Sequence, residues 1–195
     1  MKKLFFSLAL MVLATFPGIA QNTWSVDNSH TKIEFAVSHL VISETVGFFK
    51  TFGGQITTTT DDFNGANIQF TVDVASINTD NDMRDNHLKS DDFFNAEKYP
   101  KMTFKSTSFK KIEGKKYKLT GLLTIRDVTK TVEFDVIYNG TVKDPYGKTK
   151  AGFKLTGSIN RFDYGLKWNT MAEAGAVVGD MVDIKINIEL SKDKK

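Results

Sequence analysis

Four polar side chains could act on a ligand: His39, Arg84, His87 and Arg161. Arg84 and His87 are three residues apart, so a helix would place both on one face, where a guanidinium and an imidazole can bind an anion such as phosphate. The same pair is equally typical of a helix end or a solvated surface. The spacing alone therefore indicates either an anion site or a surface pair.

Catalytic chemistry has little support in the sequence. His30 and His39 are two of only three histidines, and they are nine residues apart, which in a strand is about 30 Å, too far to share a metal through that strand. The adjacent acids Asp91 and Asp92 could pair as acid and base, but without a partner motif they are typical of a solvated turn. The chain has no metalloprotease, nucleophile-elbow, P-loop or dinucleotide-binding motif, and no cysteine. We expect no catalytic residue, metal or cofactor.

The first 20 residues have the three-part pattern of a secretory signal peptide. A basic start at Lys2 and Lys3 precedes an apolar run, and small residues end at Ala20. We expect cleavage after Ala20, which makes 1–20 a signal peptide and 21–195 one domain, periplasmic or secreted. An uncleaved anchor is the alternative, but the run is short for a membrane span. Cleavage lowers the formal charge from +3 to +1, because two lysines leave, and a nearly neutral domain is not expected to bind nucleic acid.

The domain that remains is predicted to consist of strands. Apolar and polar residues alternate with a period of two over 68–74, 132–138 and 182–190, and more weakly over 31–38, 101–108, 116–126 and 150–159. Segments 23–28 and 52–60 are further candidates. About nine strands, each with one apolar face and no long amphipathic helix to cover it, must fold onto themselves as a sandwich or a closed barrel.

The lengths of the connections predict two different ends for such a barrel. Short turns are expected at 61–65, 112–115 and 144–147, whereas 75–100 and 160–180 are long. In an antiparallel meander without crossovers, the three short turns share one end. The long connections, together with a loop at 39–51, ring the other end as a mouth. Residues 80–89 are predicted to form a short helix there, capped by Asp80 or Asn81.

One face of these strands carries large apolar side chains. A barrel of about eight strands either fills its interior with such side chains or leaves room for one ligand, and alternation does not decide between the two. The residues are Phe35, Val37, Phe70, Val72, Phe104, Leu119, Leu123, Phe134, Val136, Phe153 and Leu155.

A set of short motifs runs through nearly all of the chain after residue 20. In order they are Trp24-Ser25-Val26-Asp27-Asn28-Ser29-His30, Ile33-Glu34-Phe35, His39, Val46-Gly47-Phe48-Phe49, Arg84-Asp85-Asn86-His87-Leu88, Ser90-Asp91-Asp92-Phe93-Phe94, Tyr99-Pro100, Gly121-Leu122-Leu123-Thr124-Ile125, Arg161-Phe162-Asp163-Tyr164-Gly165-Leu166 and Val178-Gly179-Asp180-Met181-Val182. Each motif is weak alone, but the ordered set resembles the YceI-like family, periplasmic polyisoprenoid-binding proteins with a lipocalin-like barrel. Asn28 and Thr31 stand where the family often has proline and serine.

The resemblance implies an all-β fold, a single antiparallel lipocalin-like barrel of about eight or nine strands. It also implies an apolar tunnel, lined by the eleven apolar residues above, for a long-chain isoprenoid, a quinone or a fatty lipid. Arg84, His87, Arg161 and His39 would then meet the polar head group at the mouth. We expect an exported carrier, not an enzyme, without stable membrane insertion, and a homodimer is compatible with the sequence. An enzyme acting on the same lipid and a small outer-membrane barrel are the alternatives.

Overall fold

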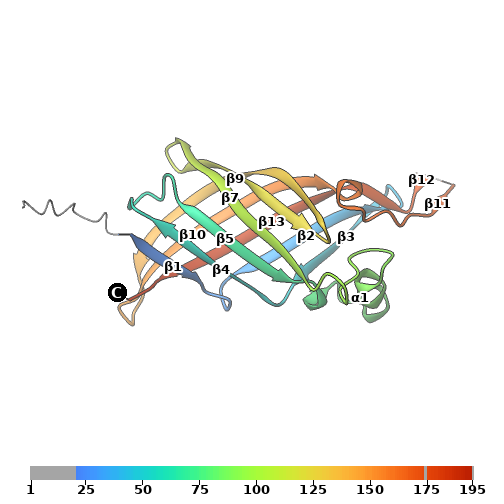
Figure 1. Cartoon of the computed structure of the whole chain (residues 1–195), viewed down its shortest axis with the longest axis horizontal. Coiled ribbons are helices and arrows are strands. Elements are labelled where there is room, and N and C mark those ends of the chain that lie inside the picture. The colour runs from blue at the N-terminus through green and yellow to red at the C-terminus, as the bar shows by residue number, and fades with distance from the viewer. Residues whose placement is uncertain (1–20, 174, 195) are drawn as a thin grey trace, which may run out of the picture.

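A computed structural model describes residues 21–173 and 175–194, and the predicted signal peptide lies outside this part of the chain. Antiparallel strands form a closed barrel, which Figure 1 shows from the side. The sheet closes because β1 pairs with β13, the first strand with the last. No helix in the described residues is long and apolar enough to cross a membrane. The predicted fold class, an all-β antiparallel barrel, is confirmed.

Eight strands make the wall, because two pairs of short strands run end to end. β1 and β2 both pair with β13, β1 at Leu190 to Lys192 and β2 at Val178 to Asn187, so together they form one long bent strand. β3 and β4 form a second bent strand beside it. The wall strands are β1 (Asn22–Val26) with β2 (Lys32–His39), β3 (Ser43–Phe49) with β4 (Phe52–Thr58), β5 (Asn67–Asp73), β7 (Lys101–Glu113), β8 (Lys116–Ile125), β9 (Val128–Lys143), β10 (Thr149–Asn160) and β13 (Val178–Lys192).

The prediction of a loop over 39–51 is wrong, because β3 occupies most of that segment. Thr45, Gly47 and Phe49 of β3 pair with Val37, Phe35 and Ile33 of β2, so the inward positions of β3 include a threonine and a glycine. The period-two apolar pattern is therefore missing from β3. The glycine is required there, because a side chain at this position would collide with the ring of Phe35.

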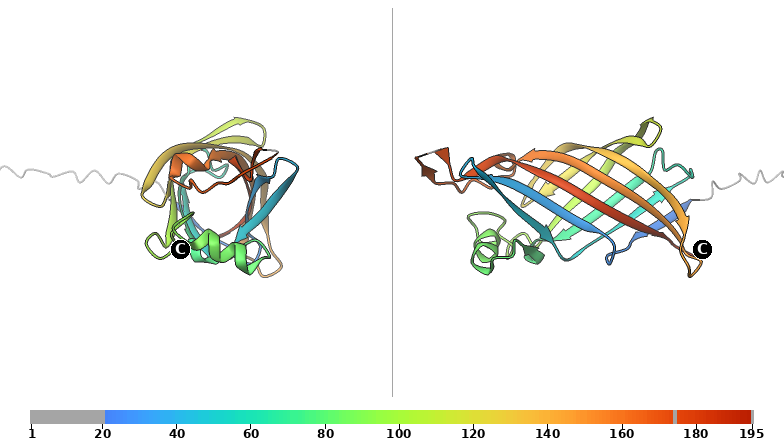
Figure 2. Two further views of the ribbon diagram at one scale, coloured as in Figure 1. Left: turned by 90° about the vertical axis from the view of Figure 1, so that its right-hand side faces the viewer. Right: turned by 180° about the vertical axis from the view of Figure 1, so that it is seen from behind.

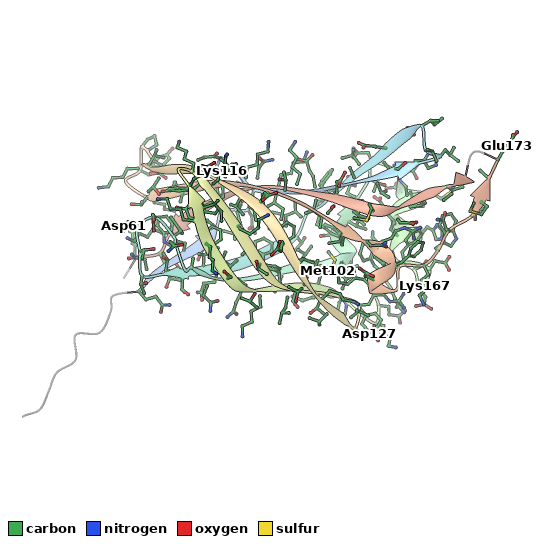
Figure 3. All side chains as sticks on the ribbon, turned by 90° about the horizontal axis from the view of Figure 1, so that it is seen from above. Asp61, Met102, Lys116, Asp127, Lys167 and Glu173 are labelled. Carbon is green, nitrogen blue, oxygen red and sulfur yellow. The ribbon has the colours of Figure 1, made fainter. Side chains whose placement is uncertain are left out.

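The two ends of the barrel differ as the meander predicted. The short connections β4–β5, β7–β8 and β9–β10 lie at one end, with the C-terminus, and we call it the closed end. The long connections β5–β7 and β10–β13 lie at the other end (Figures 1 and 2). Figure 3 shows Asp61 and Lys116 at the first end, and Asp127, Lys167 and Glu173 at the second. The hairpin between β2 and β3 and the tight β8–β9 turn also lie at the second end, which we call the open end.

The long connections carry the remaining short elements. Between β5 and β7 the chain forms the 3-10 turn η1 (Val74–Ser76), β6 (Ile77–Asn78) and the helix α1 (Asp82–Lys89). The Asn81 side chain caps α1 by accepting from the Arg84 backbone N–H, at 2.9 Å, so the predicted helix is confirmed. Between β10 and β13 lie the 3-10 turn η2 (Arg161–Tyr164), β11 (Met171–Ala172) and β12 (Gly175–Ala176). Both connections stand around the open end (Figure 2, left).

Candidate functional site

The barrel encloses one long cavity of about 650 Å³. Its lining begins near the closed end with Phe63, Phe109 and Leu190, and it reaches the open end at Met83 and Trp168. Because Met83 is 83% exposed, the cavity opens to the surface there. The volume lies in the range of pockets that hold a small organic ligand, roughly 300–1,000 Å³.

All eleven apolar residues that the sequence places on the inner face line this cavity: Phe35, Val37, Phe70, Val72, Phe104, Leu119, Leu123, Phe134, Val136, Phe153 and Leu155. They come from β2, β5, β7, β8, β9 and β10, which lie on all sides of the lumen. The barrel is therefore hollow rather than filled, which the alternation pattern alone left undecided.

Glycines facing several of these rings explain why the barrel stays hollow. An added Cβ would lie 2.4 Å from the Phe35 ring at Gly47, 2.4 Å from Phe70 at Gly54, 2.3 Å from Phe104 at Gly121 and 2.7 Å from Phe134 at Gly157. Each ring therefore lies across the bare backbone of the neighbouring strand, as phenylalanines do when they cover inward-facing glycines. A ring that lies along the wall takes less of the lumen than one that points to the axis.

The closed end is plugged by aromatic side chains. Phe63, at the tip of the β4–β5 turn, is 1% exposed, and its ring centroid lies 5.0 Å from those of both Trp24 and Phe153. The turn is pinned in place because the Tyr117 hydroxyl donates to the Asp62 carbonyl at 2.6 Å. Phe63 was not among the predicted site residues. A single large apolar residue inside the polar stretch 61–65 was the available signal.

At the open end, a buried carboxylate ties α1 to Thr79, directly after β6, and β6 in turn pairs with β3 of the wall. Asp85 is 4% exposed and accepts from the Thr79 backbone N–H at 2.8 Å and from the Thr79 hydroxyl at 2.6 Å. Arg84 donates to the Thr79 hydroxyl and carbonyl, both at 2.8 Å. Arg84 lines the cavity while its residue remains exposed, so its guanidinium lies at the mouth, next to solvent.

Arg161 also lines the cavity, but its guanidinium holds the protein together. The residue is 3% exposed, and its N–H groups donate to the carbonyls of Gly179, Leu166, Trp168 and Val178. Burial lowers the pKa of Arg161, and the nearby Asp180 opposes this shift. The positive charge is satisfied by carbonyl dipoles rather than by a carboxylate, and it fixes the β10–β13 connection at the mouth.

The two histidines predicted at the mouth line the same cavity. The ring of His87 packs edge-on against Trp168 and Phe93, with centroids 5.0 and 5.1 Å away, and its Nε2 lies 2.8 Å from a carboxylate oxygen of Asp92. His39 ends β2, where its backbone pairs with Val178. The structure thus brings His39, Arg84, His87 and Arg161 to one opening, although they come from three different segments.

Arg126 was missed by the sequence analysis, although it links two of the segments at the mouth. It lies in the tight turn between β8 and β9, and its guanidinium contacts the Asp91 carboxylate at 2.8 Å and the Phe93 carbonyl at 3.0 Å. It also reaches the carbonyl of Gly165, at 3.4 Å. A turn arginine has no sequence pattern that reveals these contacts, because its partners lie more than 30 residues away.

A second polar cluster, also missed, lies outside the lumen at the bend between β1 and β2. Lys150 bridges Asp27 and Glu189, and His30 lies 3.3 Å from Asp27. The lysine contact, as the largest influence, lowers the pKa of Asp27 to about 2 and raises that of Lys150. Asp27, His30 and Glu189 are close enough to ligate a metal, but the ammonium of Lys150 already neutralises the two carboxylates. We interpret the cluster as a brace for the bend.

The fold and the cavity together define a small antiparallel barrel with an apolar lumen, one plugged end and polar groups gathered at the other. The chain belongs to the family with a YceI-like domain, whose model matches residues 24–190. A UPF0312 protein of Staphylococcus aureus is 37% identical over 170 residues, which cover 86% of this chain and 96% of that protein.

Solved structures share the fold. BcnA of Burkholderia cenocepacia superposes with a TM-score of 0.74 at 26% identity, over 84% of this chain and 98% of that one. A polyisoprenoid binding domain from Saccharophagus degradans gives a TM-score of 0.65 at 16% identity, over 87% and 98% of the two chains. At that identity the second likeness shows the fold alone. The predicted family is confirmed.

Proposed function

We propose that this protein is an exported carrier that holds a long-chain isoprenoid or a related lipid inside the barrel. The observation that carries the proposal is the distribution of polar groups along the cavity. The lining between the plug at Phe63 and the mouth is formed mainly by phenylalanine, leucine, isoleucine and valine, whereas the side chains of His39, Arg84, His87 and Arg161 gather at the opening. Glu34 also belongs to the lining, but it alternates with the inward residues Ile33 and Phe35 of β2, so its side chain is on the opposite face of the strand. A ligand with a long apolar tail and one polar end matches this distribution.

The tail supplies most of the affinity in this proposal. Removing roughly 300 Å² of apolar tail from water would contribute about 7.5 kcal/mol at about 25 cal/mol per Å². Ordering the tail and the loss of free motion oppose this gain, and the surplus decides the dissociation constant. The lumen exists before the ligand arrives, so the protein loses little conformational entropy when the ligand binds.

The head group would meet Arg84 first. The Arg84 residue is exposed and its guanidinium donates only to Thr79, through Nε and one terminal nitrogen, whereas the buried guanidinium of Arg161 is occupied by four carbonyls. A charged head would gain about 1.5–3 kcal/mol from one charge-assisted hydrogen bond to Arg84, and a neutral quinone would gain less. The mouth therefore accepts either kind of head, with a preference for an anion.

An enzyme acting on the same lipid is the second candidate, and the geometry gives it less support. The nearest approach to a catalytic pair is His87 with Asp92, at 2.8 Å, but the Ser90 hydroxyl donates to the His87 carbonyl rather than to its ring. His87 is packed between Trp168 and Phe93, which suits a structural role.

The outer-membrane barrel is the third candidate, and it requires apolar residues on the outer face of the wall and polar residues on the inner face. Along β13 the residues Val182, Ile184, Ile186, Ile188 and Leu190 line the lumen, and the residues between them are Asp183, Lys185, Asn187 and Glu189. A barrel in a membrane turns its apolar residues to the lipid and its polar ones inward. The arrangement here favours a binding protein with a polar outer surface.

The test is to purify the protein from its own host and identify the bound lipid by native mass spectrometry and solvent extraction. Leu155→Asp places a carboxylate in the lumen, whereas Lys154→Asp places one on the outer face of the same strand. We expect the first variant to lose the lipid and the second to keep it. Leu155→Asn is a milder variant, should Leu155→Asp not fold. Protein that carries no lipid in the wild type, or equal lipid in both Asp variants, would contradict the proposal.

Export is tested separately, by N-terminal sequencing of the protein from its host. The proposal expects the mature chain to begin at Gln21. A chain that keeps residues 1–20 would refute cleavage without affecting the proposal about the cavity.

A further inference from the structure

The open end carries four exposed apolar side chains on three separate segments. Val41 and Ile42, at the tip of the β2–β3 hairpin, are 66% and 84% exposed, Met83 on the first turn of α1 is 83% exposed, and Met171 on β11 is 74% exposed. We call these four residues the apolar rim. The segments that carry them surround the mouth, since Met83 itself, His39 beside the hairpin tip and Val177 after β12 line the cavity.

The hairpin tip holds its apolar residues outward at a cost in backbone strain. Leu40 and Val41 have φ angles of 52° and 64°. A β-branched residue in this left-handed region is unfavourable, and such strain is concentrated at functional sites. The Leu40 backbone N–H donates to the Val177 carbonyl at 3.0 Å, which fixes the tip beside the β11–β12 hairpin. Because Val41 and Ile42 are exposed in the free protein, burial of their side chains does not offset the backbone strain there. A surface that covers both side chains would offset it.

The charges around the rim indicate what kind of surface could cover it. Acids flank the rim, since Glu44 lies in the tip segment 38–44, Asp80 and Asp82 precede Met83, and Glu173 follows Met171. The exposed cations Arg84, next to Met83, and Lys167 offset these carboxylates only in part. The rim therefore has no basic cluster that would attract an anionic lipid surface. A zwitterionic bilayer is neutral, and it offers an apolar interior into which single side chains can insert.

We propose that the apolar rim docks the open end of the barrel onto the surface of a zwitterionic lipid bilayer. The rim residues stand on three separate segments, so the rim forms three prongs rather than one flat patch, which suits insertion between lipids better than contact with a protein face. The inference rests on the proposed function: a docked mouth lets a lipid tail pass between the bilayer and the cavity without crossing water.

The experiment measures flotation of the purified protein with phosphatidylcholine vesicles. The rim variant is Ile42→Ser with Met171→Ser, two residues that do not line the cavity. The matched control is Ile112→Ser with Val142→Ser, which are 62% and 66% exposed near the turns of the closed end. We expect wild type and control to bind the vesicles equally. The rim variant should bind at least about tenfold more weakly, because it lacks two apolar side chains that would enter the bilayer.

Three results of the flotation experiment would overturn the docking proposal. Wild-type protein could fail to float with the vesicles, or the rim and control variants could bind equally. Binding that grows with added phosphatidylglycerol would show that attraction to anionic lipid, not insertion of the rim, is responsible. Size-exclusion chromatography is the companion measurement, and a dimer that dissociates only in the rim variant would show that a second copy covers the rim instead.

Loading of the cavity is measured without vesicles, so that the two proposals can fail independently. A fluorescent long-chain fatty acid added in solution should bind wild type and rim variant equally. Docking without such loading would contradict the carrier function while the docking stands. Equal loading with no docking would overturn the docking alone.

Discussion

Two adjacent glycines of β4, Gly53 and Gly54, offer a matched test of how the lumen is kept open. A Cβ added at Gly53 would meet nothing within 4 Å. One added at Gly54 would lie 2.4 Å from Cδ2 of Phe70 and 2.8 Å from the carbonyl oxygen of Gln69. Neither glycine has a positive φ, so alanine suits the backbone at both. Either alanine lowers the conformational entropy of the unfolded chain by the same amount. The difference in stability between the two variants therefore measures how well the folded wall accommodates the added Cβ at each position.

The two variants should differ in sign. Gly53→Ala should stabilise the protein by about 0.4–1 kcal/mol, because alanine loses less backbone entropy on folding. Gly54→Ala should destabilise it by about 1–3 kcal/mol, the usual cost of overpacking. At about 2–4 °C per kcal/mol for a domain of this size, the melting temperatures should differ by at least about 3 °C. The displaced Phe70 ring would turn toward the axis and shorten the tail that the lumen can hold.

Urea denaturation of both variants, in wild type and in a Phe70→Ala background, measures the effect. Without the ring, Gly54→Ala should lose at least half of its cost, and the remainder belongs to the Gln69 carbonyl. Equal stability of Gly53→Ala and Gly54→Ala would refute the idea that Gly54 exists to accommodate the ring. So would a cost of Gly54→Ala that stays the same when Phe70 is absent.

Three further predictions concern the brace, the plug and the mouth. The depressed pKa of Asp27, about 2, means that its stabilising effect is present above pH 4 and is lost as the pH falls toward 2. Asp27→Asn should therefore lower the free energy of unfolding by about 2 kcal/mol at neutral pH. Below pH 4 the free energy of unfolding of the variant should decrease less with falling pH than that of the wild type, which acid titrations followed by circular dichroism would show. Phe63→Ala should lower the free energy of unfolding, measured in urea, by about 3–5 kcal/mol. It should also let a water-soluble quencher reach a fluorescent ligand through the closed end. Unchanged quenching would contradict the role of Phe63 as a plug. Arg161→Ala should destabilise the protein by about 3 kcal/mol or more, because four carbonyls at the mouth lose the donor that satisfies them. Arg84→Ala should cost less than about 1 kcal/mol and weaken only ligands with an anionic head. Calorimetric unfolding and ligand titration would separate the two roles.

The inner face of the barrel could be predicted because side-chain direction in a strand follows from sequence alone. Successive residues point to opposite faces, so alternation in β5, β9 and β13 reveals which residues share the lumen without knowledge of the neighbouring strands. The grouping of mouth residues was predictable for a related reason. In a meander every second connection returns to the same end, and unequal loop lengths then identify that end.

Other features depended on pairs of residues that no local pattern links. β3 escaped prediction because its inward positions are chosen to fit Phe35 on the next strand, not to be apolar themselves. Arg161 was expected to be free for a ligand, but its guanidinium is buried and donates to four carbonyls of the β10–β13 connection and the start of β13. Burial and hydrogen-bond partners of a long polar side chain are properties of the packed loops, which the order of residues does not display.

The sequence does not determine whether the barrel is filled or hollow, whereas the tertiary structure does. Alternation determined that large apolar side chains face inward, and the count of strands determined a barrel of a size that can be filled or empty. The tertiary structure decided for a cavity of about 650 Å³, because the rings of Phe35, Phe70, Phe104 and Phe134 lie over glycines. The volume left in a lumen depends on the direction of each ring relative to the adjacent strand, and only the register between strands sets that direction.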